Sequence, residues 1–353
     1  MTMFLSPKAR LARAQHDLRI GLPIVLGDGV LVAAVETLDR DGLTRLRALG
    51  ETDLVLSPSR AETLKARVYA SDHVRIPLPD GADLRWLRAS ADPSSDLDYP
   101  MKGPYLARRA ALNAEACIAA LSLCRRAHLL PAALVLRLEN VPAGLTQLSL
   151  DEVATLGAPV LRQVAGARVP LAVSSAGRVL VFRDDDGDEE HYAVEIGAPD
   201  RDKPVLARLH SACFTGDVIG SRKCDCGSQL QGALDAIGTA GAGVLLYLNQ
   251  EGRGIGLANK MRAYSLQDQG FDTVEANHRL GFADDERDFT IGAQILQAMG
   301  FSKVRLMTNN PAKVARMQSC GLQVVERVPL QVGRTEDNSA YLDTKATKSG
   351  HLL

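Results

Sequence analysis

The sequence predicts an α/β fold of the mixed α+β kind, divided into two domains. The chain has 353 residues, and chains of this length usually divide into two or more domains, each with its own hydrophobic core. Hydrophobic residues make up 46% of it, enough to fill two interiors. Short apolar runs alternate with helical patterns, and in the C-terminal half they repeat as strand–loop–helix units. We therefore expect domains at residues 1–168 and 169–353.

The first domain is expected to open with a helix over residues 8–20, which stops at Gly21, a usual residue after a helix end. Short apolar runs predict strands at 23–26 and 30–35. A long helical pattern covers 105–127, and a strand over 132–138 follows it.

The second domain is expected to contain a hairpin, because strand-like runs flank the acidic stretch 184–190 with Gly187 at its tip. A strand at 244–248, a glycine-rich loop at 250–256 and a helix at 257–269 form one unit. A later unit has a strand at 303–307 and a helix at 311–319, which Asn310 caps and Pro311 opens.

Charge and hydropathy exclude several classes of partner. The net charge is −1, so the chain has no net positive charge to attract the phosphate backbone of a nucleic acid. No apolar run approaches the roughly eighteen residues that a membrane span needs. The N-terminal stretch has no secretory signal pattern. We expect a cytoplasmic protein with no nucleic-acid and no membrane partner.

Three of the six cysteines, Cys213, Cys224 and Cys226, fall within fourteen residues. In a reducing compartment such a cluster favours metal binding or catalysis over disulfides. Zinc prefers four ligands and binds sulfur, so three thiolates would leave one position for water. The alternative is three small buried hydrophobes, but the residues flanking the last two are polar. Cys320 ends a predicted helix and is expected to be buried, not a fourth ligand.

Two loops have features of phosphate sites. Residues 250–256 lie between a strand and a helix, where glycine lets the backbone approach a phosphate. Residues 308–313 place Thr308 and Lys313 around a second helix start. Either loop alone is more often a plain connection, but together beside a metal site they favour a phosphorylated ligand. The charged run 284–288 is by itself typical of an exposed turn.

The C-terminal half resembles the GTP cyclohydrolase II family. The likeness rests on RLHS at 208–211, CFTGD at 213–217, CDCG at 224–227, QEGR at 250–253, IGL at 255–257, Tyr264, DTVEAN at 272–277, DERD at 285–288, TNN at 308–310 and YLDTK at 341–345. Members of that family open the imidazole ring of GTP to give 2,5-diamino-6-(5-phosphoribosylamino)pyrimidin-4(3H)-one, formate and diphosphate, the first step of riboflavin biosynthesis.

The resemblance implies a role for each matching residue. Cys213, Cys224 and Cys226 would hold Zn2+ together with a water, and Mg2+ would accompany the triphosphate. GTP would be held by Arg208, His210, Ser211, Gln229, Glu251, Gly252, Arg253, Thr273, Thr308 and Lys313. The catalytic set would be Tyr264, Asp285 and Arg287, with Asp285 as proton acceptor and Arg287 as nucleophile toward the α-phosphate. A homodimer is also expected.

The residues themselves question one of these roles. Arginine stays protonated throughout the neutral pH range, so Arg287 could instead stabilise charge on the α-phosphate.

Ala212 stands where the family usually has glutamate, and Asn249 where arginine is common. Two alternatives therefore stay open: a non-catalytic GTP-binding sensor, and a paralogue acting on another purine or pyrimidine. The intact catalytic set argues against both.

Residues 10–165 more faintly resemble 3,4-dihydroxy-2-butanone 4-phosphate synthase. The likeness rests on DLR at 17–19, GLPIVL at 21–26, VLVAA at 30–34, LSPSRA at 56–61 and LPAA at 130–133. That enzyme needs an acidic loop that binds magnesium, but here Asp28 stands alone before the strand at Val30. The segment 111–116, which should carry a metal-binding histidine, has none. We expect a degenerate domain without synthase activity.

Overall fold

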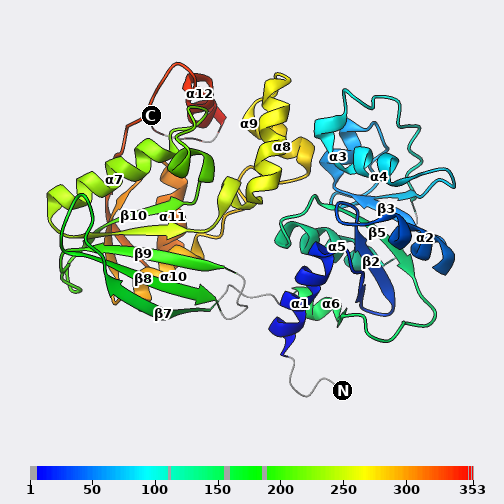
Figure 1. Cartoon of the computed structure of the whole chain (residues 1–353), viewed down its shortest axis with the longest axis horizontal. Helices are drawn as coiled ribbons and strands as arrows, with labels where there is room; N and C mark the ends of the chain where they lie inside the picture. Colours follow the sequence, from blue (N-terminus) through cyan, green and yellow to red (C-terminus); the bar gives the residue numbers. More distant parts are fainter. Residues whose placement is uncertain are drawn as a thin grey trace. The chain divides into compact units, whose positions relative to one another are not determined.

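The chain forms two compact units, each of which is described by itself (Figure 1). The computed structural model describes residues 6–109, 113–154, 160–184, 189–348, 350 and 352. Unit 1 comprises Met1–Gly157 and Ile255–Glu286, and unit 2 comprises Ala158–Gly254 and Arg287–Leu353. We call Ile255–Glu286 the inserted segment, because it interrupts the sequence of unit 2. Both units combine a sheet with helices, which confirms the predicted mixed fold.

Unit 1 is built on a six-stranded sheet in the order β4-β3-β5-β2-β1-β6. Its strands are β1 (Ile24–Leu26), β2 (Val30–Ala34), β3 (Asp53–Leu56), β4 (Val74–Pro77), β5 (Ala132–Arg137) and β6 (Gln147–Leu148). Neighbouring strands are antiparallel, except that β1 and β6 run parallel.

Helices cover both faces of this sheet. Alternate residues of β2 enter different cores, with Leu31 on one face and Val32 on the other. The Val32 face is covered by α1 (Pro7–Arg19), α5 (Ala114–Arg126) and α6 (Leu150–Ala154). The Leu31 face is covered by α2 (Arg40–Leu49), α3 (Pro58–Thr63), α4 (Leu84–Ala91), α8 (Gly256–Asp268) and α9 (Thr273–Leu280). Burial on both faces explains why these strands read as unbroken apolar runs.

Unit 2 is built on a seven-stranded sheet in the order β13-β12-β10-β11-β9-β8-β7. The strands are β7 (Leu161–Arg168), β8 (Gly177–Asp184), β9 (Glu190–Ile196), β10 (Val205–Ser211), β11 (Gly243–Leu248), β12 (Lys303–Met307) and β13 (Gln323–Val328). The four from β10 to β13 are parallel, whereas β7, β8 and β9 form an antiparallel extension. The pairing of β8 with β9 confirms the expected hairpin, although residues 185–188 lie outside the described part.

The helices of unit 2 also lie on two faces. One core takes residues from α10 (Thr290–Ala298) and α11 (Pro311–Ser319), and the other from α7 (Cys226–Ala240). Ala207 and Leu209 of β10 enter the first core, and Leu206 enters the second. Because side chains alternate along a strand, Arg208 and His210 share the face of Leu206, which α7 covers. A further helix, α12 (Ser339–Lys348), follows near the C-terminus.

The structure corrects two sequence-based expectations. The helix expected over 105–127 begins only at Ala114, which Asn113 caps. Tyr105 is instead in the core, bonded to Ser90, and the Arg108 amide pairs with the Arg75 carbonyl. The expected division at residue 168 is also displaced, because β7 already pairs within the second sheet and the inserted segment packs in unit 1.

Most other expected elements lie within a few residues of their predicted bounds. These are the helices at 8–20, 257–269 and 311–319 and the strands at 23–26, 30–35, 132–138, 244–248 and 303–307. Among the described residues, no helix combines the length and apolar character that crossing a bilayer requires.

Phe182 of β8 tests the packing of unit 2, because its side chain is fully buried in the core of that unit. We expect Phe182→Ala to lower the free energy of unfolding by about 3–5 kcal/mol, through lost burial and the cavity left behind. Urea unfolding followed by circular dichroism measures this. Val325→Ala on β13, which removes a side chain that is 45% exposed, is the matched control and should cost under about 0.5 kcal/mol. Equal losses in the two variants would contradict the packing described.

Candidate metal centre at the ends of the parallel strands

The three cysteines singled out in the sequence converge in unit 2. Their Sγ atoms all lie within 4.8 Å of one another, and no other such group of metal-ligating side chains occurs among the described residues. Cys213 follows β10 and begins the short helix η2 (Phe214–Val218), whereas Cys226 is the first residue of α7. Two chain turns separated by ten residues thus supply one cluster.

Gly216 lets the three thiols come this close. A Cβ atom at this position would lie 2.9 Å from Cys224 Sγ, closer than real contacts allow, and 3.1 Å from Cys213 Sγ. The Gly216 amide donates to Cys213 Sγ at 3.4 Å. The backbone of η2 therefore forms a wall of the cluster that a side chain would fill.

The chemistry of the donor set fits a metal ion. The neighbouring Cys213 thiol is the main cause that raises the pKa of Cys226, and burial adds to it. The pKa of Cys224 is raised as well, again chiefly by Cys213. Three adjacent sulfurs cannot all ionise without a cation between them. A divalent metal would supply that cation, and the N-terminus of α7 favours a thiolate at Cys226.

A buried carboxylate holds the first cysteine in place. Asp217 Oδ2 accepts the Cys213 amide at 3.0 Å, the Tyr247 hydroxyl at 3.0 Å and lies 3.0 Å from His210 Nε2. The side chains of Asp217 and His210 are each 3% exposed. Asp217 and Tyr247 were not among the site residues predicted from sequence. The spacing could have indicated Asp217, since a residue four positions after Cys213 lies one helical turn away.

Arg208 places a buried positive charge on the same face of the sheet. Burial lowers its pKa to about 10. It donates to the Met307 carbonyl at 3.0 Å and to the side chain of Gln229, which in turn bonds Asp225. Its Nε is buried and has no hydrogen-bond partner within the described chain. This cation is fixed by neutral acceptors, a setting that favours an anionic ligand.

The loop after β11 is held to the metal centre by Glu251. Its carboxylate accepts the Phe214 amide of η2 at 2.6 Å and the Gly252 amide at 2.9 Å. Gly252 and Arg253 both have left-handed backbone, with φ of 63° and 62°. For arginine this conformation costs free energy, as is common at ligand-binding loops.

The loop after β12 contributes two more of the predicted residues. Thr308 is 2% exposed, and its hydroxyl accepts the Asn310 amide at 3.0 Å. Lys313 is 6% exposed and donates to the Leu209 carbonyl at 3.2 Å. Since β10, β11 and β12 are parallel, these loops and the cysteines meet at one edge of the sheet, where ligands usually bind in such folds.

After the inserted segment, unit 2 resumes at Arg287, which lies near the same edge of the sheet. Its Nη1 lies 3.4 Å from the Ser211 hydroxyl, and its guanidinium is 5.0 Å from the centre of the Phe289 ring. Lys313 is 5.2 Å from the same ring. Arg316 lies at the same distance of 5.2 Å, so three cations surround the Phe289 ring.

The predicted residues divide between the two units. Arg208, His210, Ser211, Gln229, Glu251, Gly252, Arg253, Arg287, Thr308, Lys313 and the three cysteines belong to unit 2, whereas Tyr264, Thr273 and Asp285 belong to the inserted segment in unit 1. In unit 1, Thr273 opens α9 and its hydroxyl accepts from Gln267 at 3.3 Å. Lys260 lies 5.7 Å from the centre of the Tyr264 ring.

Of the two departures from the family pattern, Asn249 makes a side-chain contact and Ala212 only a backbone one. The Ala212 amide donates to the Leu248 carbonyl at 2.7 Å, which extends the pairing of β10 with β11. The Asn249 amide donates to His191 Nδ1 at 3.0 Å, and its side chain bonds the Glu190 carbonyl. Asn249 therefore links the end of β11 to β9.

The chain is similar to proteins of one family. The family model for GTP cyclohydrolase II matches residues 162–329. A GTP cyclohydrolase-2 of Azospirillum brasilense is 42% identical over 359 residues, which cover 97% of this chain and 93% of the relative. A GTP cyclohydrolase-2 of Cronobacter sakazakii is 54% identical over 195 residues, 55% of this chain and 98% of the relative. The riboflavin biosynthesis protein RibBA of Bacillus cytotoxicus is 59% identical over 165 residues, 47% of this chain and 42% of the relative.

Solved structures add little to this. A two-domain 3,4-dihydroxy-2-butanone 4-phosphate synthase from A. baumannii covers 92% of this chain and 100% of its own, with a TM-score of 0.31 and 14% identity. The synthase-like character of the N-terminal half stays a prediction.

The cysteine cluster makes a direct prediction about metal content. We expect Cys224→Ser to lower the bound metal at least about tenfold, because a hydroxyl is a poor ligand where a thiolate is needed. Elemental analysis by mass spectrometry of the purified protein measures this. Cys320→Ser, which changes a partly buried cysteine outside the cluster, should keep the wild-type content. Full metal content in the Cys224 variant would show that the cluster is not a metal site.

Proposed function

We propose that this chain, which belongs to the GTP cyclohydrolase II family, is a hydrolase that opens the imidazole ring of GTP. The products are 2,5-diamino-6-(5-phosphoribosylamino)pyrimidin-4(3H)-one, formate and diphosphate, and the reaction begins riboflavin biosynthesis. The observation that carries the proposal is the cluster of three thiols at the edge of the sheet where Arg208 and Lys313 are buried.

Zinc is the metal that best suits this donor set, because it accepts three thiolates and keeps a fourth position open. Cys213, Cys224 and Cys226 would hold it. When bound, zinc supplies Lewis-acid chemistry that brings the pKa of a coordinated water to about 7. Asp217 accepts the Cys213 amide and contacts His210. Contacts of this kind hold the side chains that bind a metal in the orientation that binding requires.

The buried cations favour a triphosphate. Arg208 and Lys313 are 7% and 6% exposed, so their charges are weakly screened by water. Thr308 and the left-handed loop at Gly252 and Arg253 add donors that approach a phosphate closely. We assign GTP binding to these residues with His210, Ser211, Gln229, Glu251 and Thr273, and Mg2+ to the triphosphate itself.

Tyr264, Asp285 and Arg287 are our proposed catalytic set. The guanidinium of Arg287 bonds Ser211 and lies over Phe289, and an arginine remains protonated at neutral pH. We assign it charge stabilisation at the α-phosphate, and Asp285 the acceptance of a proton. A trapped phosphoguanidinium adduct would show a covalent role for Arg287 instead.

We further propose that the N-terminal domain has lost synthase activity. Leu26 pairs with Val30 in the β1–β2 hairpin, so only residues 27–29 form its turn. Asp28 is the one carboxylate in that turn, whereas magnesium requires several oxygen ligands. Of the segment expected to carry a histidine, residues 111 and 112 lie outside the described part.

The setting of the enzyme is proposed on general grounds. Free thiols that bind a metal require a reducing compartment, and GTP is available in the same place. We therefore propose a cytoplasmic enzyme that works as a homodimer.

GTP turnover tests the proposed function. We expect the zinc-loaded protein with Mg2+ to release formate and diphosphate in equal amounts, and the chelator-stripped protein to release neither, because the three cysteines would then hold no ion to activate a water. Coupled assays for the two products measure this. Equal rates before and after metal removal would overturn the proposal, and GTP binding without formate release would instead favour the sensor.

Arg208 tests the assignment of the anion site. We expect Arg208→Gln to lower kcat/KM roughly a hundredfold, since it removes a buried charge that faces the substrate phosphates. Arg305→Gln on β12, which breaks only an exposed ion pair with Glu326, should leave kcat/KM unchanged. Steady-state kinetics with GTP measure both. Similar values for the two variants would contradict the role of Arg208.

The inactivity of the N-terminal domain is tested with the synthase substrate. We expect no 3,4-dihydroxy-2-butanone 4-phosphate from ribulose 5-phosphate and Mg2+, because the β1–β2 turn offers too few oxygen ligands. Mass spectrometry of the reaction mixture checks this, with an active synthase as the positive control. Product formation at a rate proportional to protein concentration would contradict it.

A further inference from the structure

The inserted segment is held by the core of unit 1. Ala263 and Leu266 of α8 and Leu280 of α9 are buried in the same core as the sheet residues Leu31 and Leu134. The sequence of this segment lies within the stretch that matches the cyclohydrolase family, yet it packs with the N-terminal half. The apolar contacts hold the helices, but by themselves they fix the register of a helix only loosely.

Polar contacts on one face of α8 fix that register. Arg262 donates from Nε to Asp92 Oδ2 at 2.9 Å and from Nη2 to Glu36 Oε1 at 2.9 Å. Its Nη1 donates to Asn259 Oδ1 at 2.7 Å. All three nitrogens of the planar guanidinium are therefore used, in a geometry that only arginine provides.

The acceptors of Arg262 are themselves fixed. Glu36 Oε2 accepts the Leu130 amide at 2.8 Å. Asp92 Oδ1 accepts the amide and the hydroxyl of Ser94 at 2.9 and 2.6 Å. Asn259 is fully buried and donates to the His128 carbonyl at 3.0 Å. Arg262 thus connects α8 to two separate parts of unit 1, at Glu36 and Asp92, and Asn259 of the same helix reaches a third at His128.

A buried ion network supports the turn that receives α8. Arg60 is 1% exposed and bonds both carboxylate oxygens of Asp96, at 2.7 and 2.8 Å, as well as the carbonyls of Ala89 and Ser90. Lys102 also bonds Asp96. Asp92 and Asp96 flank the short helix η1 (Pro93–Ser95), so this network holds η1 from the side away from α8.

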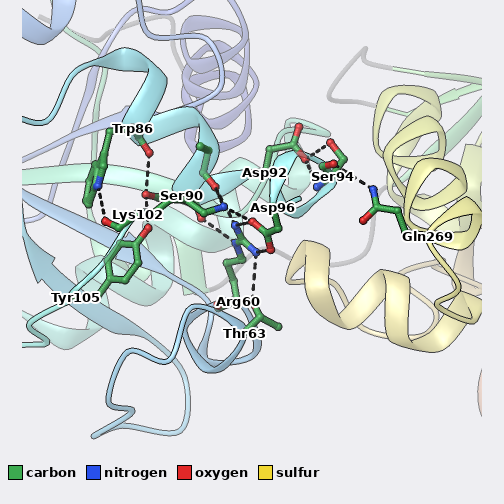
Figure 2. Close-up of polar contacts among 11 residues, drawn as sticks. Arg60, Thr63, Trp86, Ser90, Asp92, Ser94, Asp96, Lys102, Tyr105 and Gln269 are labelled. Atoms are coloured by element: carbon green, nitrogen blue, oxygen red, sulfur yellow. Dashed lines mark hydrogen bonds and ion pairs between the residues drawn. The ribbon is translucent and has the colours of Figure 1, made fainter. Parts of the chain in front are cut away.

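Figure 2 shows the two sides of this turn together. Arg60 points at Asp96 on one side, and Gln269 reaches across to Ser94 on the other. The side-chain Nε2 of Gln269 donates to the Ser94 carbonyl at 3.2 Å. Gln269 is the C-cap of α8 and follows Arg262 by seven residues, so the two lie on the same side of this helix, about two turns apart.

Tyr264, a proposed catalytic residue, follows Arg262 by two positions. At about 100° per residue, its side chain lies about 200° further round α8. The face that contacts η1 and Glu36 is therefore opposite the face that carries Tyr264. A change in the register of α8 on unit 1 would move Tyr264 with it.

We propose that Arg262 is a positioning residue, and that the N-terminal unit serves the cyclohydrolase by holding the inserted segment through it. This inference rests on the proposed function, because it takes Tyr264 and Asp285 to act in GTP turnover. It also gives the degenerate domain a task that needs no synthase chemistry. The Cronobacter relative is too short to include a counterpart of the N-terminal unit, so the task concerns chains that carry one.

The test compares Arg262→Ala with Arg10→Ala in the full-length, zinc-loaded protein. Arg10 pairs with Glu152, with side chains 21% and 19% exposed, the same values as for Arg262 and Glu36. Arg10 lies on α1 and its partner on α6, away from α8. The control therefore removes an equally buried ion pair of unit 1 without touching the inserted segment.

We expect Arg262→Ala to lower kcat for formate release about ten- to a hundredfold, since a small misplacement of a reacting group has this effect. KM for GTP should change less than about threefold, because most binding residues lie in unit 2. Zinc content and Tm should match those of Arg10→Ala. Hydrogen exchange of the α8 amides should be faster than in that control, and millimolar guanidinium should restore part of kcat.

A kcat of Arg262→Ala within twofold of the Arg10→Ala value would overturn the positioning role. So would parallel losses of kcat, zinc and Tm without rescue by guanidinium, since these indicate general damage. If the alanine variant does not fold, the double variant Glu36→Gln with Asp92→Asn removes the same ion pairs at constant shape, and its kcat is compared with the control by the same criteria. A wild-type protein that releases no formate would instead refute the proposed function, and the exchange of the α8 amides would still report on Arg262.

Discussion

The close approach of three thiols around Gly216 is the constraint on which the rest of unit 2 depends. A side chain at this glycine would collide with two of the sulfurs, so η2 must pass the cluster as bare backbone. That passage joins the start of η2 to the start of α7, because Cys213 is the N-cap of η2 and Cys226 is the first residue of α7. The cluster is therefore both a candidate metal centre and the point where two secondary-structure elements are joined.

Hydrogen bonds of Asp217 connect the cysteine cluster to the sheet. Asp217 connects the Cys213 backbone with His210 on β10 and Tyr247 on β11. Its negative charge and the desolvation of Tyr247 keep that phenol protonated, since burial first and Asp217 second raise its pKa. A neutral hydroxyl donates one hydrogen bond to the carboxylate, and the carboxylate remains an acceptor for the ligand-bearing backbone. The parallel strands thereby connect the candidate metal centre with the loops that follow β11 and β12.

The division of the chain into units bears on the proposal that the N-terminal unit positions the inserted segment. The inserted segment belongs by sequence to the cyclohydrolase, but its apolar face is buried in the core of unit 1. Ion pairs taken from water contribute little net stability and serve mainly to select one arrangement. The contacts of Arg262 with Glu36 and Asp92 fit this description, because they tie α8 at defined positions to two other parts of unit 1.

The sequence alone determined much of this protein. The spacing of Cys213, Cys224 and Cys226 indicated a metal cluster, and the caps at Asn310 and Gly21 marked helix ends, because such signals act over a few residues. It also supplied the family, through motifs that follow one another in order. Only the tertiary structure decided that Asp217 and Tyr247 support the cluster, since their contacts join residues from different elements. It also decided that residues 105–109 lie outside any helix, and that the inserted segment joins unit 1. Those outcomes depend on which apolar surface a segment finds to cover, and periodicity along the chain shows that a helix has an apolar face without showing which core will bury it.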